Sequence, residues 1–158
     1  MIPEAELVRK EFILRQLDMP PSISITKKSL LRWVALSIGL ISKNESRDKG
    51  FLVIDALFHF LFSKKRQPTT LDIQSQIKEK NKIEMSEKLI RYHLNRLIDI
   101  GIIERNGIKY RVNPAPNSEK RDSLKESFEH WFKKEVEKQF GEVSSALEKL
   151  QKSYEQKK

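Results

Sequence analysis

The chain has 158 residues and a net charge of +9, and hydrophobic and charged residues make up 38% and 34% of it. It contains no Cys, which excludes disulfides, thiolate catalysis and Cys-based zinc sites and fits the reducing cytoplasm. No uncharged apolar run reaches the length of about 18 residues that a membrane span needs, and the acidic first residues do not resemble a secretory signal.

We therefore expect a cytoplasmic protein without a membrane partner, and its first part predicts helices. Apolar residues at helical spacing predict a helix over 2–17, which ends before Pro20 because a residue preceding Pro avoids the α region. Residues 22–25 alternate polar and apolar, which fits a short strand or an extended linker. A second helix is expected over 27–41 with Thr26 as its N-cap. Its apolar residues occur nearly all round, so we expect burial in the core or against a second subunit.

The middle of the chain begins with a polar loop over 42–49 and then the most apolar stretch, residues 51–62. Twelve residues are too few to cross a bilayer, so this stretch predicts a buried helix. Asp55 and His59 lie four residues apart within it and are expected to form a structural pair on one face.

Two further helices and a hairpin are expected next. Thr69 and Asp72 have the spacing of a capping box, which starts one helix. Ser86 is a suitable N-cap for another helix that runs to about residue 99, and Gly101 suits a left-handed C-cap. Its inward residues should be Ile90, Leu94, Leu97 and Ile98.

The hairpin is expected to consist of strands over 102–105 and 108–112. Asn106-Gly107 between them is a strong hairpin signal and predicts a type I′ turn with positive φ at both positions.

The C-terminal part predicts one long helix. Residues 113–118 are a Pro-containing linker, and Ser123 with Glu126 has capping-box spacing. The helix is expected to continue to about residue 154. Its apolar residues step by 4, 3, 4, 3 and 4, the spacing of a coiled-coil seam, and are Val136, Phe140, Val143, Leu147, Leu150 and Tyr154. We expect this stripe to form a homodimer; the alternative is packing against the N-terminal helices.

Residues 86–97 read SEKLIRYHLNRL and are followed by IGII at 100–103. This pattern resembles the recognition helix of winged helix-turn-helix regulators, and the resemblance covers residues 51–112. With its long C-terminal helix, the chain is similar to regulators of the PadR and ArsR kinds, which dimerise through flanking helices. The resemblance implies a mainly α fold with a two-stranded hairpin as the wing, and one helix in the major groove of double-stranded DNA.

Charge is concentrated in the same region. Residues 63–113 hold twelve Lys and Arg against six Asp and Glu, which is two thirds of the net charge in a third of the chain. A polyanionic partner explains this concentration. The alternative is a solvated basic surface that serves solubility.

Helix geometry assigns candidate roles. Lys88 and Arg91 can contact guanine edges or phosphates, and Asn95 can pair with adenine or hold a phosphate. Arg96 lies to one side and is a candidate for a phosphate contact or a salt bridge, whereas Lys109 would contact the DNA backbone. The full set of candidate DNA-binding residues is Ser86, Glu87, Lys88, Arg91, Tyr92, Asn95, Arg96, Arg105, Lys109 and Arg111.

Nothing in the sequence predicts catalysis, a metal or a cofactor. The three His residues lie in separate predicted helices without metal-ligand spacing, and the chain has no Gly-rich phosphate loop or nucleophile elbow. We therefore expect no enzyme.

The sequence thus predicts a double-stranded DNA-binding homodimer that regulates transcription. Two alternatives stay open: a winged-helix interaction module within a larger protein complex, and a sequence-independent chromatin- or RNA-binding protein. The expected division of the chain is an N-terminal helical extension over 1–49, a winged helix-turn-helix domain over 50–113, and a linker with a dimerisation helix over 114–158.

Overall fold

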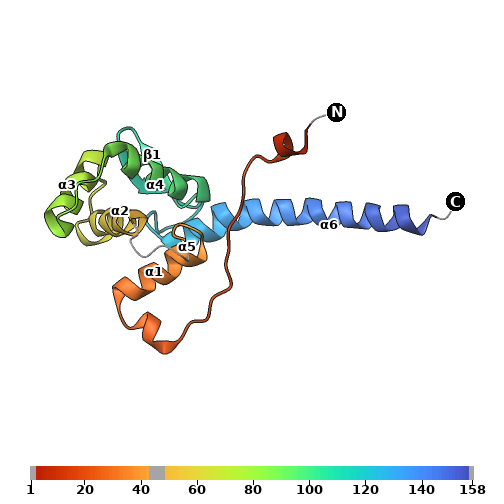
Figure 1. Cartoon of the computed structure of the whole chain (residues 1–158), viewed down its shortest axis with the longest axis horizontal. Helices are drawn as coiled ribbons and strands as arrows, with labels where there is room; N and C mark the ends of the chain where they lie inside the picture. The colour runs from red at the N-terminus through yellow and green to blue at the C-terminus, as the bar shows by residue number, and fades with distance from the viewer. Residues whose placement is uncertain (1–2, 43–48, 157–158) are drawn as a thin grey trace.

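Helices form most of the chain in the computed structural model, which describes residues 3–42 and 49–156. The one sheet among these residues is a two-stranded antiparallel hairpin. The mainly α class, the hairpin and the long C-terminal helix are therefore confirmed (Figure 1). The regular elements are α1 (Lys27–Ser37), α2 (Lys49–Phe58), α3 (Thr70–Asn81), α4 (Glu87–Ile100), β1 (Ile103–Asn106), β2 (Lys109–Val112), α5 (Leu124–Ser127) and α6 (Lys133–Glu155).

The core lies between α2, α3 and α4. The predicted apolar helix is confirmed as α2, which continues into a π-helical turn, His59–Ser63. The most deeply buried side chains of the three helices are Val53, Ile54, Leu57, Ile73, Ile77, Ile90, Leu94 and Leu97. Asp55 does not form the expected pair with His59, because its carboxylate accepts a hydrogen bond from Lys80 of α3 at 3.0 Å.

Local signals at the ends of α3 and α4 are confirmed. The Asp72 amide donates to Thr69 Oγ1 at 3.1 Å, and the Thr69 amide donates to Asp72 Oδ2 at 2.9 Å, which completes the capping box. Ser86 Oγ accepts from the Leu89 amide at 3.2 Å. Gly101 ends α4 with φ of 101°, the left-handed conformation that favours glycine.

The hairpin forms where it was expected, but its turn is different. Asn106 pairs with Lys109, so the two turn residues are Gly107 and Ile108. Only Gly107 has positive φ, at 66°, which is the requirement of a type II′ turn. The predicted type I′ turn is wrong because Asn106 remains in the strand.

The hairpin is tied to the start of α3. The Tyr110 amide donates to the Pro68 carbonyl at 2.9 Å, and Thr69 forms an antiparallel bridge with Lys109. The Tyr110 ring is buried, and its hydroxyl lies 3.3 Å from Thr70 Oγ1. The segment before α3 therefore acts as a short third strand beside β2.

The predicted N-terminal helix is wrong. Only Glu4–Leu7 forms a helical turn, of the 3₁₀ type, and residues 8–20 run extended along the other elements (Figure 1). Arg15 accounts for the extended path. Its guanidinium donates to the carbonyls of Leu36 at 2.8 Å and Ile41 at 2.9 Å. Its backbone amide donates to the Ser37 carbonyl at 2.7 Å. These contacts satisfy carbonyls at the end of α1, which a free-standing N-terminal helix would leave open.

The region around α1 also departs from expectation. Residues 22–25 form neither a strand nor an extended linker, because Pro21–Ser24 is a 3₁₀ turn, for which Pro supplies a suitable φ. Thr26 is the N-cap of α1, as predicted, and accepts from the Ser29 amide at 3.1 Å. The helix is shorter than expected and is not buried on most sides, since Leu30 and Val34 are 40% and 37% exposed. Most of the predicted polar loop, 43–48, lies outside the described residues.

The C-terminal helix is nearly as long as predicted. It passes from α5 through a π-helical turn, Phe128–Phe132, into α6, which projects from the other elements (Figure 1). Ser123 caps its start by accepting from the Glu126 amide at 3.2 Å. The Glu126 carboxylate instead accepts from Ser118 Oγ, so only half of the predicted capping box forms. None of the described helices has both the length and the apolarity that crossing a bilayer requires.

Candidate nucleic-acid interface

Helix α4 has a buried face and a polar exposed face. Ile90, Leu94 and Leu97 are fully buried, which confirms them as inward residues, and Ile98 is half-buried. Ser86 caps the start of the helix through its hydrogen bond with the Leu89 amide. The candidate residues that are exposed along this face are Ser86, Glu87, Lys88, Arg91, Tyr92 and Asn95.

Charges on this face are partly compensated. Arg91 lies 3.7 Å from Glu87 one turn earlier, and both side chains are 46% exposed. An exposed pair at this distance contributes little to stability, so Arg91 can exchange Glu87 for another anion at small cost. Lys88 makes no ion pair with any residue in the described ranges. Tyr92 is exposed, and the centre of its ring lies 5.1 Å from the centre of the His93 ring in an edge-on arrangement.

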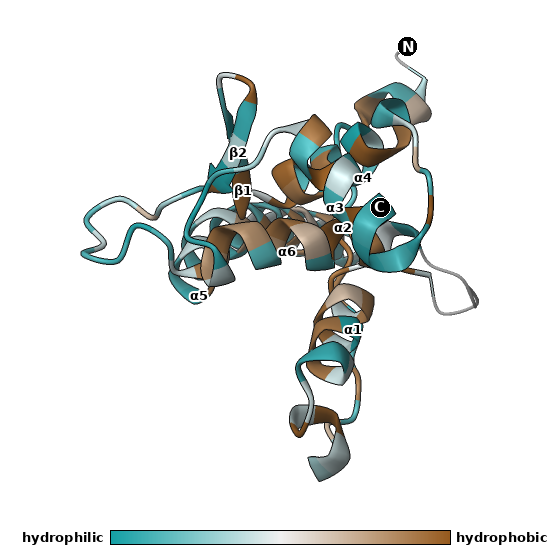
Figure 2. Ribbon diagram, turned by 90° about the vertical axis from the view of Figure 1, so that its left-hand side faces the viewer, coloured by the Kyte–Doolittle hydropathy of each residue, from teal (hydrophilic) through white to brown (hydrophobic). Residues whose placement is uncertain are grey.

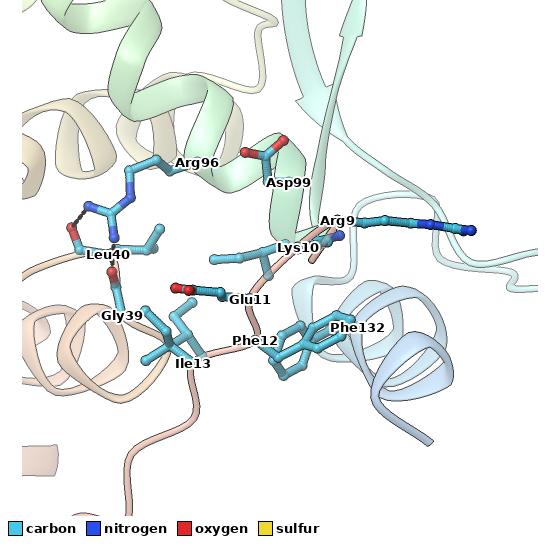
Figure 3. A pocket seen from close by; sticks show the side chains of 12 residues that line it. Arg9, Lys10, Glu11, Phe12, Ile13, Gly39, Leu40, Arg96, Asp99 and Phe132 are labelled. Atoms are coloured by element: carbon cyan, nitrogen blue, oxygen red, sulfur yellow. Dashed lines mark hydrogen bonds between the residues drawn. The ribbon is translucent and has the colours of Figure 1, made fainter. Parts of the chain in front are cut away.

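Arg96 differs from the other candidates because its guanidinium is already occupied. It donates to the Leu40 carbonyl at 3.0 Å and to the Gly39 carbonyl (Figure 3). Gly39 has φ of 75°, and the space above it is filled by Ile13 of the N-terminal segment. Arg96 therefore fixes the chain that follows α1 against α4, an internal role that the sequence did not predict for this residue.

The hairpin carries three candidate cations and projects from the helices (Figure 2). Arg111 faces Glu104 on the opposite strand, and its Nε donates to Glu104 Oε1 at 2.7 Å. The Arg105 guanidinium lies 5.6 Å from the centre of the Tyr110 ring. Lys109 is exposed and makes no ion pair with a described residue. Arg105 and Lys109 therefore offer more available charge than Arg111.

Two residues of α3, Gln74 and Lys78, reach the turn between α3 and α4 and are not among the candidate residues that the sequence predicted. Gln74 Nε2 donates to the Met85 carbonyl at 2.9 Å, immediately before the N-cap of α4. Lys78 pairs with Glu84 at 3.1 Å across the same turn. A shallow cavity of about 490 Å³ lies between these side chains and Ser86. Gln74 and Lys78 are four residues apart, so the sequence alone could have placed both on one face of α3.

The pKa of Asp72 clearly departs from its ordinary value. The Thr69 amide, which donates to the carboxylate, lowers its pKa; the Thr69 hydroxyl and the nearby charges of Arg66 and Lys109 act in the same direction, and partial burial opposes them. The carboxylate is thus held in its charged form, where it caps α3 beside the hairpin.

The predicted dimerisation stripe lies on α6. Val136 is half-buried near the start of the helix, and the remaining members are exposed, from 49% at Val143 to 81% at Tyr154. The described part of the N-terminal segment contacts α6 near its start, where Lys10 pairs with Glu135 at 2.7 Å and Phe12 packs on Phe132. Packing against N-terminal helices, the alternative, therefore does not cover the stripe.

The described residues contain no group of three or more His, Asp or Glu side chains placed to hold a metal ion. Comparison of the chain with protein-family models, curated proteins and solved structures found no match.

Proposed function

We propose that the chain is a winged helix-turn-helix protein that binds double-stranded DNA as a homodimer and regulates transcription. In this proposal α4 enters the major groove and the β1–β2 hairpin is the wing. The resemblance of residues 51–112 to winged helix-turn-helix regulators supports it, and so does the arrangement of the elements.

The observation that carries the fold proposal is the pairing of Pro68 and Thr69 with β2. The helices α2, α3 and α4 are followed by the β1–β2 hairpin. Strand β2 pairs with the segment between α2 and α3. A winged helix has this same order and pairing. It places the hairpin beside the helix pair, where a wing can contact the DNA backbone next to the groove that α4 occupies.

The observation that favours DNA is the exposed polar face of α4. Lys88, Arg91 and Asn95 carry donors that match guanine, adenine or phosphate, and all three are solvent-exposed. Glu87 is compatible with this face because it can accept from cytosine once Arg91 turns to an anion. The hairpin adds Arg105 and Lys109 for backbone contacts.

Internal pairing reduces the charge available for binding. Of the cations in residues 63–113, several are already paired with acidic neighbours: Arg66 with Asp72, Lys78 with Glu84, Lys80 with Asp55, Arg91 with Glu87 and Arg111 with Glu104. The binding surface that we propose therefore includes fewer cations than the net charge of residues 63–113 indicates. It centres on Lys88, Arg91, Asn95, Arg105 and Lys109.

A second candidate function is a winged-helix module that binds another protein. Ile108 at the hairpin tip is 71% exposed, and Leu71 at the start of α3 is 58% exposed. Exposed apolar side chains of this size suit a protein surface better than a phosphate backbone.

Two double variants test the DNA proposal. Lys88→Ala with Arg91→Ala removes cations from the groove-facing helix, so binding to a selected duplex should fall more than binding to a random one. Arg105→Ala with Lys109→Ala removes backbone contacts, so binding to both duplexes should fall alike. Fluorescence anisotropy measures both affinities, with Lys149→Ala and Lys152→Ala on α6 as the matched control. Equal effects of all three double variants would contradict the proposal.

A further inference from the structure

The outer part of α6 presents an apolar stripe that no described residue covers. Helix α6 projects away from α1, α2, α3 and α4 (Figure 1), and Phe140 and Tyr154 are 72% and 81% exposed. Glu135, where the N-terminal segment is attached through Lys10, lies about 100° around the helix from Val136 and so flanks the stripe. An apolar face of this length on a projecting helix needs a partner.

From Phe140 onward, the positions beside the stripe are small or uncharged. In a heptad, Phe140, Leu147 and Tyr154 take position a, and Val136, Val143 and Leu150 take position d. The e and g positions over 138–154 are then Gln139, Ser144, Ala146, Gln151 and Ser153. The Lys and Glu side chains of this stretch lie on the remaining positions. The charged e and g pairs that fix partner choice and orientation in many coiled coils are therefore missing here.

A parallel pair of these helices would be poorly packed. Parallel dimers favour β-branched residues at a and Leu at d, whereas here Val136 and Val143 stand at d and the aromatic residues stand at a. In parallel register, each side chain also meets its own copy. Tyr154 would face a second Tyr and Val143 a second Val, so wide and narrow layers would alternate along two helices of fixed separation.

The stripe is complementary to itself when reversed. Its six members are placed symmetrically about residue 145. In an antiparallel pair, each member therefore meets a different member of the stripe, and the larger side chains meet smaller ones. The resulting pairs are Val136 with Tyr154 of the partner subunit, Phe140 with Leu150 of the partner subunit, and Val143 with Leu147 of the partner subunit. A two-fold interface has this reciprocal form, in which residue i meets residue j and j meets i.

We infer that two copies of the chain pair through α6 in antiparallel orientation, with the two-fold axis beside Ser145. Small residues surround the axis: Ser144 and Ala146 each meet their own copy, which lets the two helices approach closely there. The overlap from Val136 to Tyr154 is about 28 Å long. The inference rests on the homodimer of the proposed function and specifies the orientation of its two subunits. In this orientation the two α4 helices lie at opposite ends of the paired α6 helices.

Cross-linking distinguishes the two orientations, and the absence of native Cys makes every introduced thiol unique. Full-length Gln139→Cys is mixed with full-length Ser153→Cys and treated with a short bis-maleimide. The antiparallel pair places these two positions side by side, so a 139–153 cross-link is expected between chains. The matched mixture is Gln139→Cys with Ser144→Cys, positions that are adjacent only in a parallel pair.

Peptide mass spectrometry identifies the linked positions, and light scattering gives the mass of each sample before treatment. A 139–153 link with no 139–144 link supports the antiparallel pair. A dimer that yields the 139–144 link instead overturns it and leaves the proposed homodimer intact. A monomer at every concentration up to that used for cross-linking overturns both. All three replaced side chains are exposed, so the substitutions leave the core unchanged.

Discussion

Arg96 of α4 donates a hydrogen bond to the Leu40 carbonyl at 3.0 Å, across 56 positions of the chain. The same guanidinium reaches the Gly39 carbonyl, so one side chain satisfies two carbonyls that follow the end of α1. This contact joins the N-terminal part of the structure to the helix that we propose to enter the groove. Arg96, one of the candidate interface residues, thus helps to hold α4 in position through internal hydrogen bonds.

Arg96→Ala should destabilise the protein by about 1–3 kcal/mol, because two part-buried carbonyls lose a charged donor. Arg96→Lys should recover only part of this, since an ammonium group lacks the planar fork that reaches both carbonyls. Urea unfolding followed by circular dichroism measures the free energy of unfolding. Unchanged stability together with a clearly shallower salt dependence of DNA binding would show instead that Arg96 contacts phosphate.

Gly101→Ala should cost about 2 kcal/mol or more. Gly101 has φ of 101°, and a Cβ there would lie 2.8 Å from Trp131 Cβ, so both the backbone and the packing of the C-terminal helix on α4 resist a side chain. Gly141→Ala is the matched control, because a Cβ on this helical glycine meets no neighbour. It should raise stability by up to about 1 kcal/mol. Thermal unfolding of both variants measures the contrast; equal destabilisation would contradict the account of Gly101.

Asp72 should make stability depend on pH in the acidic range. Its pKa is lower in the folded chain, first because of the hydrogen bond from the Thr69 amide, so the folded state favours the carboxylate. The contribution is therefore fully present above the pKa of the unfolded chain, near 4, and is lost as the pH falls through the lower folded value. The loss of stability on Asp72→Asn should be largest at neutral pH and shrink toward pH 2. Urea unfolding across this range measures it, and a loss independent of pH would contradict the assignment.

The elements that the sequence predicted well have their causes close together in the chain. The caps formed by Thr69, Ser86 and Gly101 depend on residues within one helical turn, and the inward face of α4 follows from spacing alone. Sequence patterns read such local causes directly.

The errors have distant causes. The N-terminal segment has helical spacing, yet Arg15 is held by carbonyls more than twenty residues away, and these contacts outweigh the weak preference of a short isolated helix. Arg96 is bound by carbonyls that no local pattern reveals. At the hairpin, Asn106 and Gly107 are both residue types that favour turns. The pairing of Asn106 with Lys109 keeps Asn106 in the strand, so Gly107 and Ile108 form the turn.

The most direct test of the central claim is a titration of the full chain with a random double-stranded DNA at several salt concentrations. Arg105 and Lys109 supply two proposed backbone contacts per protomer and four per dimer. The logarithm of the binding constant should then fall linearly with the logarithm of salt concentration, with a slope of about −3.5 or steeper. Binding no tighter than about 10⁻⁴ M at low salt, without a salt slope, would contradict the DNA-binding proposal.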